Sequence, residues 1–90
     1  MAKPYRLSVL TPEREVFEGE VEYLEAPGIE GYFGVLADHA AFVTALTRGT
    51  VLLRPAGGGE RRLTVTGGLF EVGANEATLL ADAVEDAGKP

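Results

Sequence analysis

The sequence predicts an all-β protein, a flattened β-sandwich or barrel of about eight to ten short strands in a single domain. Short apolar segments alternate with polar residues at a period of two, and turn signals recur roughly every 8–12 residues. Helical periodicity is nearly absent. Twelve glycines in 90 residues supply the positive φ angles that many tight turns need.

The first predicted strand is Tyr5–Leu10, whose residues alternate between apolar and polar. Thr11–Glu13 predicts a turn, because the proline between them presets the backbone for the first central position of a turn. A short separate strand is expected over Glu15–Phe17, and Gly19 is expected to end it.

The segment Val21–Ala26 is strand-like, but its apolar residues break strict period two. A β-bulge near Glu22 and Tyr23 would restore the inward direction of the apolar side chains, and bulges are common at the edges of sheets. Pro27 and Gly28 are expected to end this strand.

The same alternation predicts the remaining strands. They are Gly31–Leu36, Ala41–Leu46, Gly49–Arg54, Arg62–Thr66, Leu69–Val72 and Ala77–Ala81. Ala83–Ala87 has helix-forming composition, but Gly88 stops it after about one turn, which is too short for a stable isolated helix. We therefore expect a sandwich domain over residues 1–84 and a frayed tail over residues 85–90.

The inward-facing apolar residues of these strands should form the core. The residues expected to be largely buried are Leu7, Val9, Val21, Leu24, Val35, Val43, Leu46, Val51, Leu53, Leu63, Val65, Phe70, Val72, Leu79 and Ala81.

Composition argues against several classes of function. Hydrophobic residues make up 46% of the chain and charged residues 24%, as in a folded globular domain. The net charge of −6 argues against nucleic-acid binding, which needs a basic surface, and Arg61–Arg62 is the only adjacent basic pair. The absence of cysteine rules out disulfides and thiolate metal sites. No apolar run approaches the ~20 residues of a membrane span, so we expect membrane association only through a partner.

No arrangement of residues predicts an active site. The single serine, Ser8, lies in mid-strand, and the single histidine, His39, follows Asp38 directly, so these side chains would not aim at one another as a triad. Zinc needs three or four ligands, which His39 and Asp38 do not supply, and we interpret His39 as a polar corner residue.

The glycines of residues 28–34 match neither a dinucleotide fingerprint nor a phosphate loop. The carboxylates of residues 13–30 alternate with apolar residues, which predicts a solvated strand face and no calcium loop. We expect no catalytic, cofactor-binding or metal site, and a binding or structural role follows by elimination.

The order of several motifs along the chain adds a resemblance. The motifs include GYFGVLADHA at residues 31–40 and TGGLFEV at residues 66–72, and together they cover about residues 5–84. The full set is Phe17–Val21, Ala26–Gly28, Gly31–Ala40, Ala45–Val51, Thr66–Val72 and Asn75–Asp82. In this order the sequence resembles the amino-terminal β-sandwich domain of the epsilon subunit of F-type ATP synthases.

The resemblance implies a rotor role without chemistry of its own. Members of this family bind the gamma subunit laterally, rest on the c-ring, and help couple ring rotation to ATP synthesis in the catalytic head. By position in the motif, the ring-facing loop would be Gly28, Ile29, Glu30, Gly31, Tyr32 and Phe33, and the gamma-facing residues would be Thr11, His39 and Thr44. This chain has Tyr32 where family members often carry an acidic residue, and Glu30 would then supply the charge from the other side of Gly31.

The resemblance also implies where the subunit lies in the cell and that this chain lacks the carboxy-terminal domain of long family members. The subunit would be peripheral on the cytoplasmic face of the bacterial inner membrane, as part of the proton-translocating complex. Long forms continue into a two-helix carboxy-terminal domain that in many bacteria inhibits ATP hydrolysis and can bind ATP. The present chain ends at Pro90, so we expect a short form without that inhibition and without nucleotide binding. Two alternatives stay open: a free-standing β-sandwich that binds proteins outside the synthase, and a small enzyme with an unrecognised site.

Overall fold

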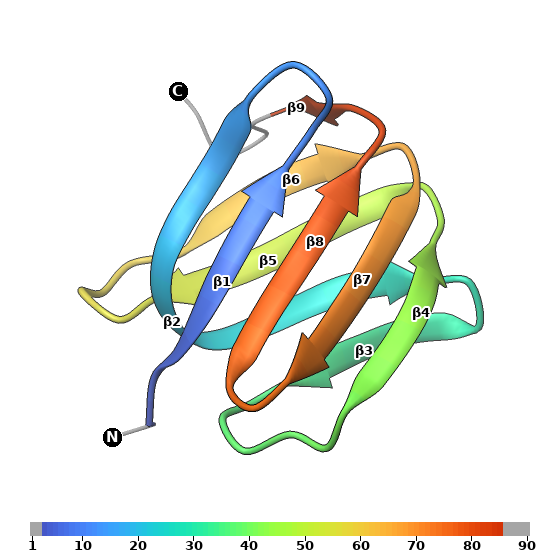
Figure 1. Ribbon diagram of the computed structural model, residues 1–90. Helices are drawn as coiled ribbons and strands as arrows, with labels where there is room; N and C mark the ends of the chain where they lie inside the picture. The colour runs from blue at the N-terminus through green and yellow to red at the C-terminus, as the bar shows by residue number, and fades with distance from the viewer. Residues whose placement is uncertain (1–2, 86–90) are drawn as a thin grey trace.

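A computed structural model describes residues 3–85 of the chain and contains nine strands and no helix over that range (Figure 1). The strands are β1 (Tyr5–Leu10), β2 (Glu15–Gly28), β3 (Gly31–Val35), β4 (Phe42–Leu46), β5 (Gly49–Pro55), β6 (Arg61–Val65), β7 (Gly68–Gly73), β8 (Glu76–Ala81) and β9 (Val84–Glu85). The predicted all-β fold in a single domain is confirmed.

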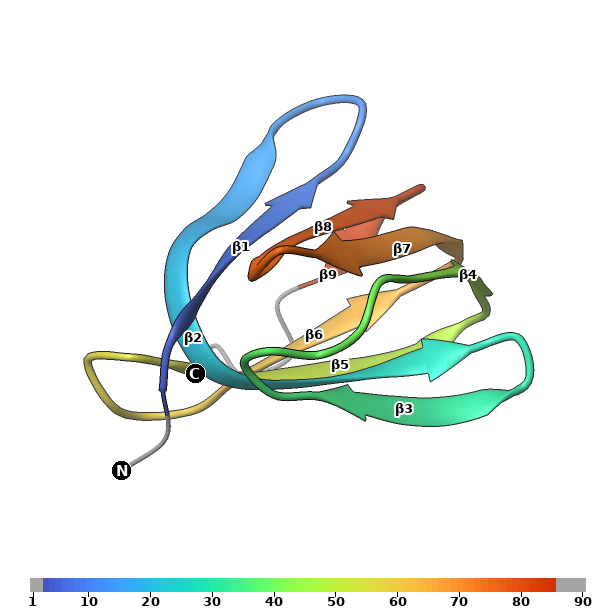
Figure 2. The ribbon, with the colours of Figure 1, turned by 60° about the horizontal axis from the view of Figure 1, so that its bottom comes forward.

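The strands form one continuous sheet that folds over on itself into two layers (Figure 2). Their order is β1-β8-β7-β4-β2-β5-β6-β9, while β3 pairs with β2 and β1 also pairs with β2. Strands β1, β8, β7 and β4 make one layer, strands β3, β5 and β6 make the other, and β2 runs through both. Neighbouring strands are antiparallel except for β1 and β8, which are parallel.

Strand β2 is longer than the sequence suggested. The prediction of a separate short strand ending at Gly19 is wrong, because Gly19 lies within β2, opposite Leu7 of β1. The first half of β2 pairs with β1, and the second half pairs with β5 and β3. The predicted bulge is confirmed by a register shift: Val21 pairs with Pro55, whereas Tyr23 pairs with Arg54.

The core lies between the two layers and matches the predicted set with one exception. Val43 was expected inside but is 64% exposed, because β4 turns Phe42, Thr44 and Leu46 inward and Val43 outward. Every other predicted core residue is buried. The structure also buries residues that the prediction left out, namely Tyr5, Val16, Ala26, Pro27, Gly28, Gly67 and Ala77.

Aromatic residues fill the core and tie its layers together. The Phe70 ring is fully buried, and its centroid lies 5.1 Å from the centroid of the Phe33 ring. The centroids of the Phe33 and Phe42 rings are 5.3 Å apart. Such tilted and edge-on ring pairs add to the free energy gained by burying the rings. At the other side of the core the Tyr5 hydroxyl donates a hydrogen bond to the Val35 carbonyl at 2.9 Å, which links β1 to β3. Burial of Tyr5 raises the pKa of its hydroxyl.

The end of the described chain is a strand. Val84 pairs with Val65 of β6, and Glu85, expected to be the first residue of the frayed tail, pairs with Thr64. The rest of the predicted tail, residues 86–90, lies outside the described residues. The boundary between domain and tail therefore stays a prediction.

Two adjacent leucines of β8 provide a matched test of the core. Leu79 is fully buried, whereas Leu80 is 45% exposed on the outer face of the same strand. We expect Leu79→Ala to lower the free energy of unfolding by about 2–5 kcal/mol, because the change leaves a cavity in the core. Leu80→Ala should lower it by only about 1 kcal/mol or less. Urea denaturation of both variants measures the difference, and equal losses would contradict the assigned direction of β8.

Candidate functional site

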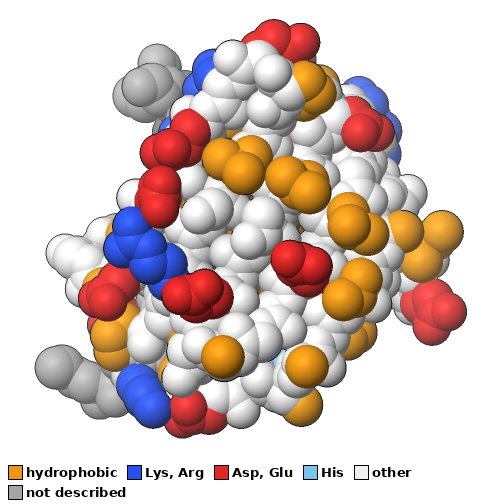
Figure 3. Space-filling model, in the orientation of Figure 1, with side chains coloured by type: hydrophobic (Ala, Val, Ile, Leu, Met, Phe, Trp, Pro, Cys, Tyr) orange, Lys and Arg blue, Asp and Glu red, His pale blue; other side chains and the backbone are white. Residues whose placement is uncertain are grey.

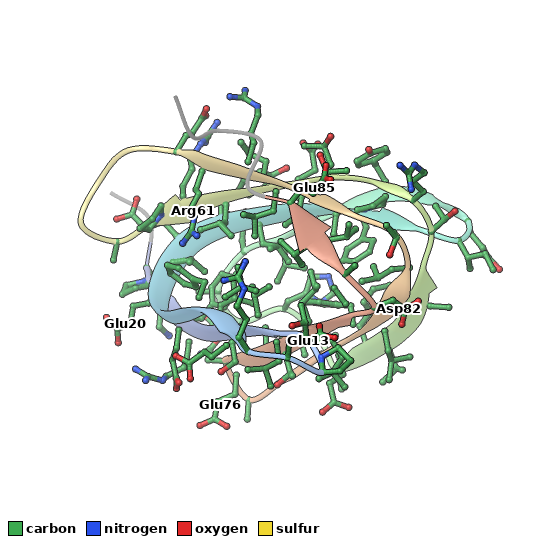
Figure 4. All side chains as sticks on the ribbon, turned by 90° about the horizontal axis from the view of Figure 1, so that it is seen from above. Glu13, Glu20, Arg61, Glu76, Asp82 and Glu85 are labelled. Atoms are coloured by element: carbon green, nitrogen blue, oxygen red, sulfur yellow. The ribbon has the colours of Figure 1, made fainter. Side chains whose placement is uncertain are left out.

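In the part of the chain that the structure describes, no catalytic constellation comes together. Ser8 lies in the middle of β1 between Glu18 and Thr78, whereas His39 lies in the loop between β3 and β4. Within residues 3–85, no three histidine, aspartate or glutamate side chains group so as to hold a metal ion. Figure 4 shows that the labelled carboxylates are spread around the molecule and come from different strands and turns.

No helix of the described chain is long and apolar enough to cross a membrane.

The predicted ring-facing segment forms the hairpin between β2 and β3. Gly28 pairs with Gly31, and Ile29 and Glu30 form the exposed tip between them. Gly28 is required here, because a Cβ atom at this position would lie 2.8 Å from the Gly31 carbonyl oxygen and 3.0 Å from the Phe33 ring. Gly31 has a φ of 128°, which side chains disfavour. Ile29, with 67% of its surface exposed, is the most exposed large apolar residue of the described chain.

The two aromatic residues of this hairpin face opposite ways. Phe33 points inward and packs against Phe42 and Phe70, so it closes one end of the core. Tyr32 points outward and is 58% exposed, and its hydroxyl accepts a hydrogen bond of 3.0 Å from the Thr50 N–H.

Strand β4 holds the hairpin from the other side. The Ile29 N–H donates to the Ala45 carbonyl and the Thr47 N–H donates to the Pro27 carbonyl, both at 2.9 Å. Because each bond joins the hairpin to β4 or to the turn after it, the tip is part of the sheet and does not form a free loop.

The three predicted gamma-facing residues do not form one cluster. Thr11 is in the β1–β2 turn, where its hydroxyl oxygen accepts hydrogen bonds from the Glu13 and Arg14 N–H groups at 3.2 and 3.1 Å. His39 is in the β3–β4 loop, at the opposite end of the sheet (Figure 1). Thr44 is half-buried and faces inward from the middle of β4.

The structure reveals a surface that the sequence analysis missed. On the outer face of the layer of β1, β8, β7 and β4, apolar side chains stand directly opposite one another across successive strands. They are Leu10, Leu80, Leu69, Ala45 and Ile29, which we call the apolar row. Val43, 64% exposed, lies beside the row on β4. Figure 3 shows hydrophobic side chains gathered across this face.

A shallow open groove of about 310 Å³ lies next to the apolar row. Ala41 and Val43 form part of its apolar wall, while the Glu71 and Glu76 side chains line it with negative charge. Gly73 deepens it, because no side chain fills the space between the neighbouring strands at this position. The outer face therefore offers an apolar strip with an acidic border.

A polar contact fixes the loop that carries His39. The Asp38 carboxylate accepts hydrogen bonds from the Asn75 amide at 3.0 Å and from the Lys3 ammonium at 3.1 Å, and the Asp38 N–H donates to the Asn75 side chain at 2.6 Å. The hydrogen bond from Asn75, together with the bond and the charge of Lys3, lowers the pKa of Asp38. Both Asp38 and Asn75 have left-handed backbone conformations, with φ values of 66° and 60°, which these residue types tolerate.

Comparison with known sequences shows the family to which this chain belongs. Residues 4–87 match the family described as "ATP synthase, Delta/Epsilon chain, beta-sandwich domain". The chain is 47% identical over 88 residues to the ATP synthase epsilon chain of Caulobacter vibrioides, with 97% of this chain and 100% of that relative covered. It is 42% identical over 87 residues to the ATP synthase epsilon chain of Maridesulfovibrio salexigens, of which it spans 61% of the length, with 97% of this chain covered.

Solved structures share the fold. One similar chain comes from a cryo-EM structure of the OSCP, F1 and c-ring of the Euglena gracilis mitochondrial ATP synthase. It superposes with a TM-score of 0.86 at 20% sequence identity, and the match covers 92% of this chain and 53% of that chain. A chain of the Tetrahymena thermophila mitochondrial ATP synthase central stalk and c-ring gives 0.77 at 19% identity, covering 94% of this chain and 68% of that one. At such identities the likeness concerns the fold alone.

The lowered pKa of Asp38 predicts a pH dependence of stability. A carboxyl group whose pKa is lower in the folded state contributes stability above its unfolded pKa and loses this contribution as the pH falls through its folded pKa. The difference in unfolding free energy between the wild type and Asp38→Asn should therefore be constant above about pH 5 and shrink below about pH 4. Urea denaturation from neutral pH down to pH 3 measures it. A difference that stays constant to the lowest pH would show that the charge of Asp38 contributes nothing.

Proposed function

Because this chain belongs to the ATP synthase epsilon-chain family, we propose that it is a non-catalytic central-stalk subunit of a proton-translocating F-type ATP synthase. In this role it binds the gamma subunit and rests on the c-ring, and so helps to couple rotation of the ring to ATP synthesis in the catalytic head. The prediction that the chain is not an enzyme agrees with its family. We propose no nucleotide binding for it.

The observation that carries this proposal is the apolar row. Monomeric proteins rarely leave large contiguous apolar patches in water, and the cores of protein interfaces are apolar. The row crosses the whole outer face of one layer and ends at Ile29, so it joins the sheet surface to the hairpin tip without a break. One subunit could thus contact two partners at once, through the face and through the tip.

We assign the apolar row and its groove to the gamma subunit. A flat face of this kind suits a lateral partner, and the carboxylates of Glu71 and Glu76 beside it favour a partner with basic side chains at the rim. Thr11 borders the row, since it lines a shallow hollow together with Leu10 and Leu80. His39 lies two positions before Ala41, which lines the groove, and its ring packs against Phe42 with the ring centroids 5.7 Å apart. Thr44 faces inward, so its part in gamma binding would be indirect.

We assign the hairpin tip to the c-ring. The tip presents one apolar side chain, Ile29, and one carboxylate, Glu30, at the end of the domain. Glu30 would meet a basic or amide side chain of a polar ring loop. In this arrangement the subunit stays peripheral, and only its partners attach it to the cytoplasmic face of the bacterial inner membrane.

A charge placed in the apolar row tests the gamma assignment. We expect Leu69→Glu to weaken binding of the cognate gamma subunit by at least about 30-fold, because central apolar interface residues carry most of the binding free energy. Leu36→Glu is the matched control, since Leu36 is 56% exposed just after β3 in the other layer. Calorimetric titration measures both affinities, after circular dichroism has shown that both variants are folded. Equal affinities for the two variants would contradict the assignment.

Removing the charge at the tip tests the ring assignment. We expect Glu30→Gln to slow association with the complex of gamma and the c-ring and to reduce the salt dependence of the association rate, because charges at an interface rim act mainly on association. Glu85→Gln, an equal change at an exposed residue of β9 in the other layer, should leave the rate unchanged. Stopped-flow association at low and physiological salt measures both. The ring assignment fails if Glu30→Gln associates like the wild type at both salt concentrations.

A further inference from the structure

The outward-facing tyrosine of the β2–β3 hairpin has a role of its own. We infer that Tyr32 and Gly49 together form a brace that fixes the hairpin against β5, so that Tyr32 positions the exposed tip and leaves contact with a partner to Ile29 and Glu30. The functional meaning of this brace rests on the proposed contact of the tip with the c-ring. The brace itself can be tested in the isolated chain.

The brace is built from one hydrogen bond and one missing side chain. The Tyr32 hydroxyl oxygen accepts the Thr50 N–H at 3.0 Å, a contact between residues 18 positions apart. A Cβ atom on Gly49 would lie 2.6 Å from that hydroxyl oxygen and 2.7 Å from the Cβ of Pro27. These separations are shorter than any ordinary contact between such atoms. Gly49 therefore leaves the space in which the Tyr32 side chain passes Pro27 and reaches the start of β5.

The hydrogen bond continues a strand pairing that has ended. The pairing of β2 with β5 stops at Glu25 and Leu52, so Thr50, two residues before Leu52, has no partner on β2. After Glu25, strand β2 continues to Gly28, which pairs with Leu46 of β4. The Tyr32 hydroxyl thus takes the place of a backbone acceptor at the Thr50 N–H. The bond holds the Tyr32 side chain over Pro27 and against the start of β5.

The brace supplies the second of two supports for the tip. On the β4 side, the Ile29 N–H and the Thr47 N–H already hold the hairpin. The turn itself adds little support, because Gly31 is exposed and has open space around the position of a Cβ atom. Only Tyr32 connects the outward side of the hairpin to β5 in this way among the contacts of the described residues. Without it, the tip would pivot about its attachment to β4.

The experiment compares Tyr32→Phe and Gly49→Ala with the wild type in the full-length chain. Tyr32→Phe keeps the ring and removes only the acceptor, while Gly49→Ala keeps Tyr32 and fills its space. Both variants should raise the hydrogen-exchange rate of the Thr50 amide roughly three- to tenfold, the effect of losing one hydrogen bond. Core amides such as that of Leu53 should exchange as in the wild type. Tyr23→Phe is the control for a lost tyrosine hydroxyl, and it should leave Thr50 unchanged.

A second measurement distinguishes positioning from a general loss of stability. NMR order parameters for the Ile29 and Glu30 amides should fall in both Tyr32→Phe and Gly49→Ala. In Tyr32→Phe, which adds no atom beside Pro27, the order parameters of β5 and the midpoint of urea denaturation should stay close to wild type. Unchanged exchange at Thr50 or unchanged order at the tip in both variants would overturn the inference. Since no partner is present in either measurement, the brace can stand even if the Glu30→Gln experiment removes the proposed ring contact.

Discussion

The passage of β2 through both layers is the constraint on which the rest of the structure depends. Between Phe17 and Val21 the residues of β2 that face the core are odd-numbered, whereas Leu24 and Ala26, which face the core after the bulge, are even-numbered. The extra residue at the bulge makes this change of phase, because a strict period of two would turn Leu24 and Ala26 to the solvent. Both layers take their position from this strand: β1 pairs with its start, β5 and β3 with its later part, and β4 with its end.

Most of the fold could be predicted from the sequence because, in most strands, the inward positions are apolar and the outward positions are mostly polar. Strand β4 shows where this signal ends. Its sequence, FVTAL, is apolar on both faces, so alternation cannot decide which side chains point inward. Pairing with β7 decides it, since Thr44 lies opposite the buried Phe70 and Val43 lies opposite the exposed Glu71. A similar limit applies at Gly19, a residue typical of turns that lies inside a long strand because β2 pairs with β1 on both sides of it.

The candidate surface was less accessible to prediction than the core. The apolar row takes one residue from each of four strands and one from the hairpin tip, and single exposed apolar residues are common on protein surfaces. Leu10, Leu80 and Leu69 become neighbours only through the pairing of β1 with β8 and of β8 with β7. The hairpin tip could be located because its glycines lie close together in the sequence. The role of Tyr32 could not be predicted, because its hydrogen-bond partner, Thr50, is on another strand and no local sequence pattern indicates the contact.

The parallel pairing of β1 with β8 has a consequence for how the protein is made. Leu10 and Leu80 lie side by side although 70 positions separate them in the chain. At elongation rates of about 5–20 residues per second, a ribosome needs roughly 4–14 seconds to add the intervening residues. During that time β1 can pair only with the start of β2, and an isolated two-stranded ribbon is marginally stable. The nascent chain thus carries an unpaired strand edge beside apolar side chains until translation is nearly complete, and this interval is when it is most exposed to aggregation.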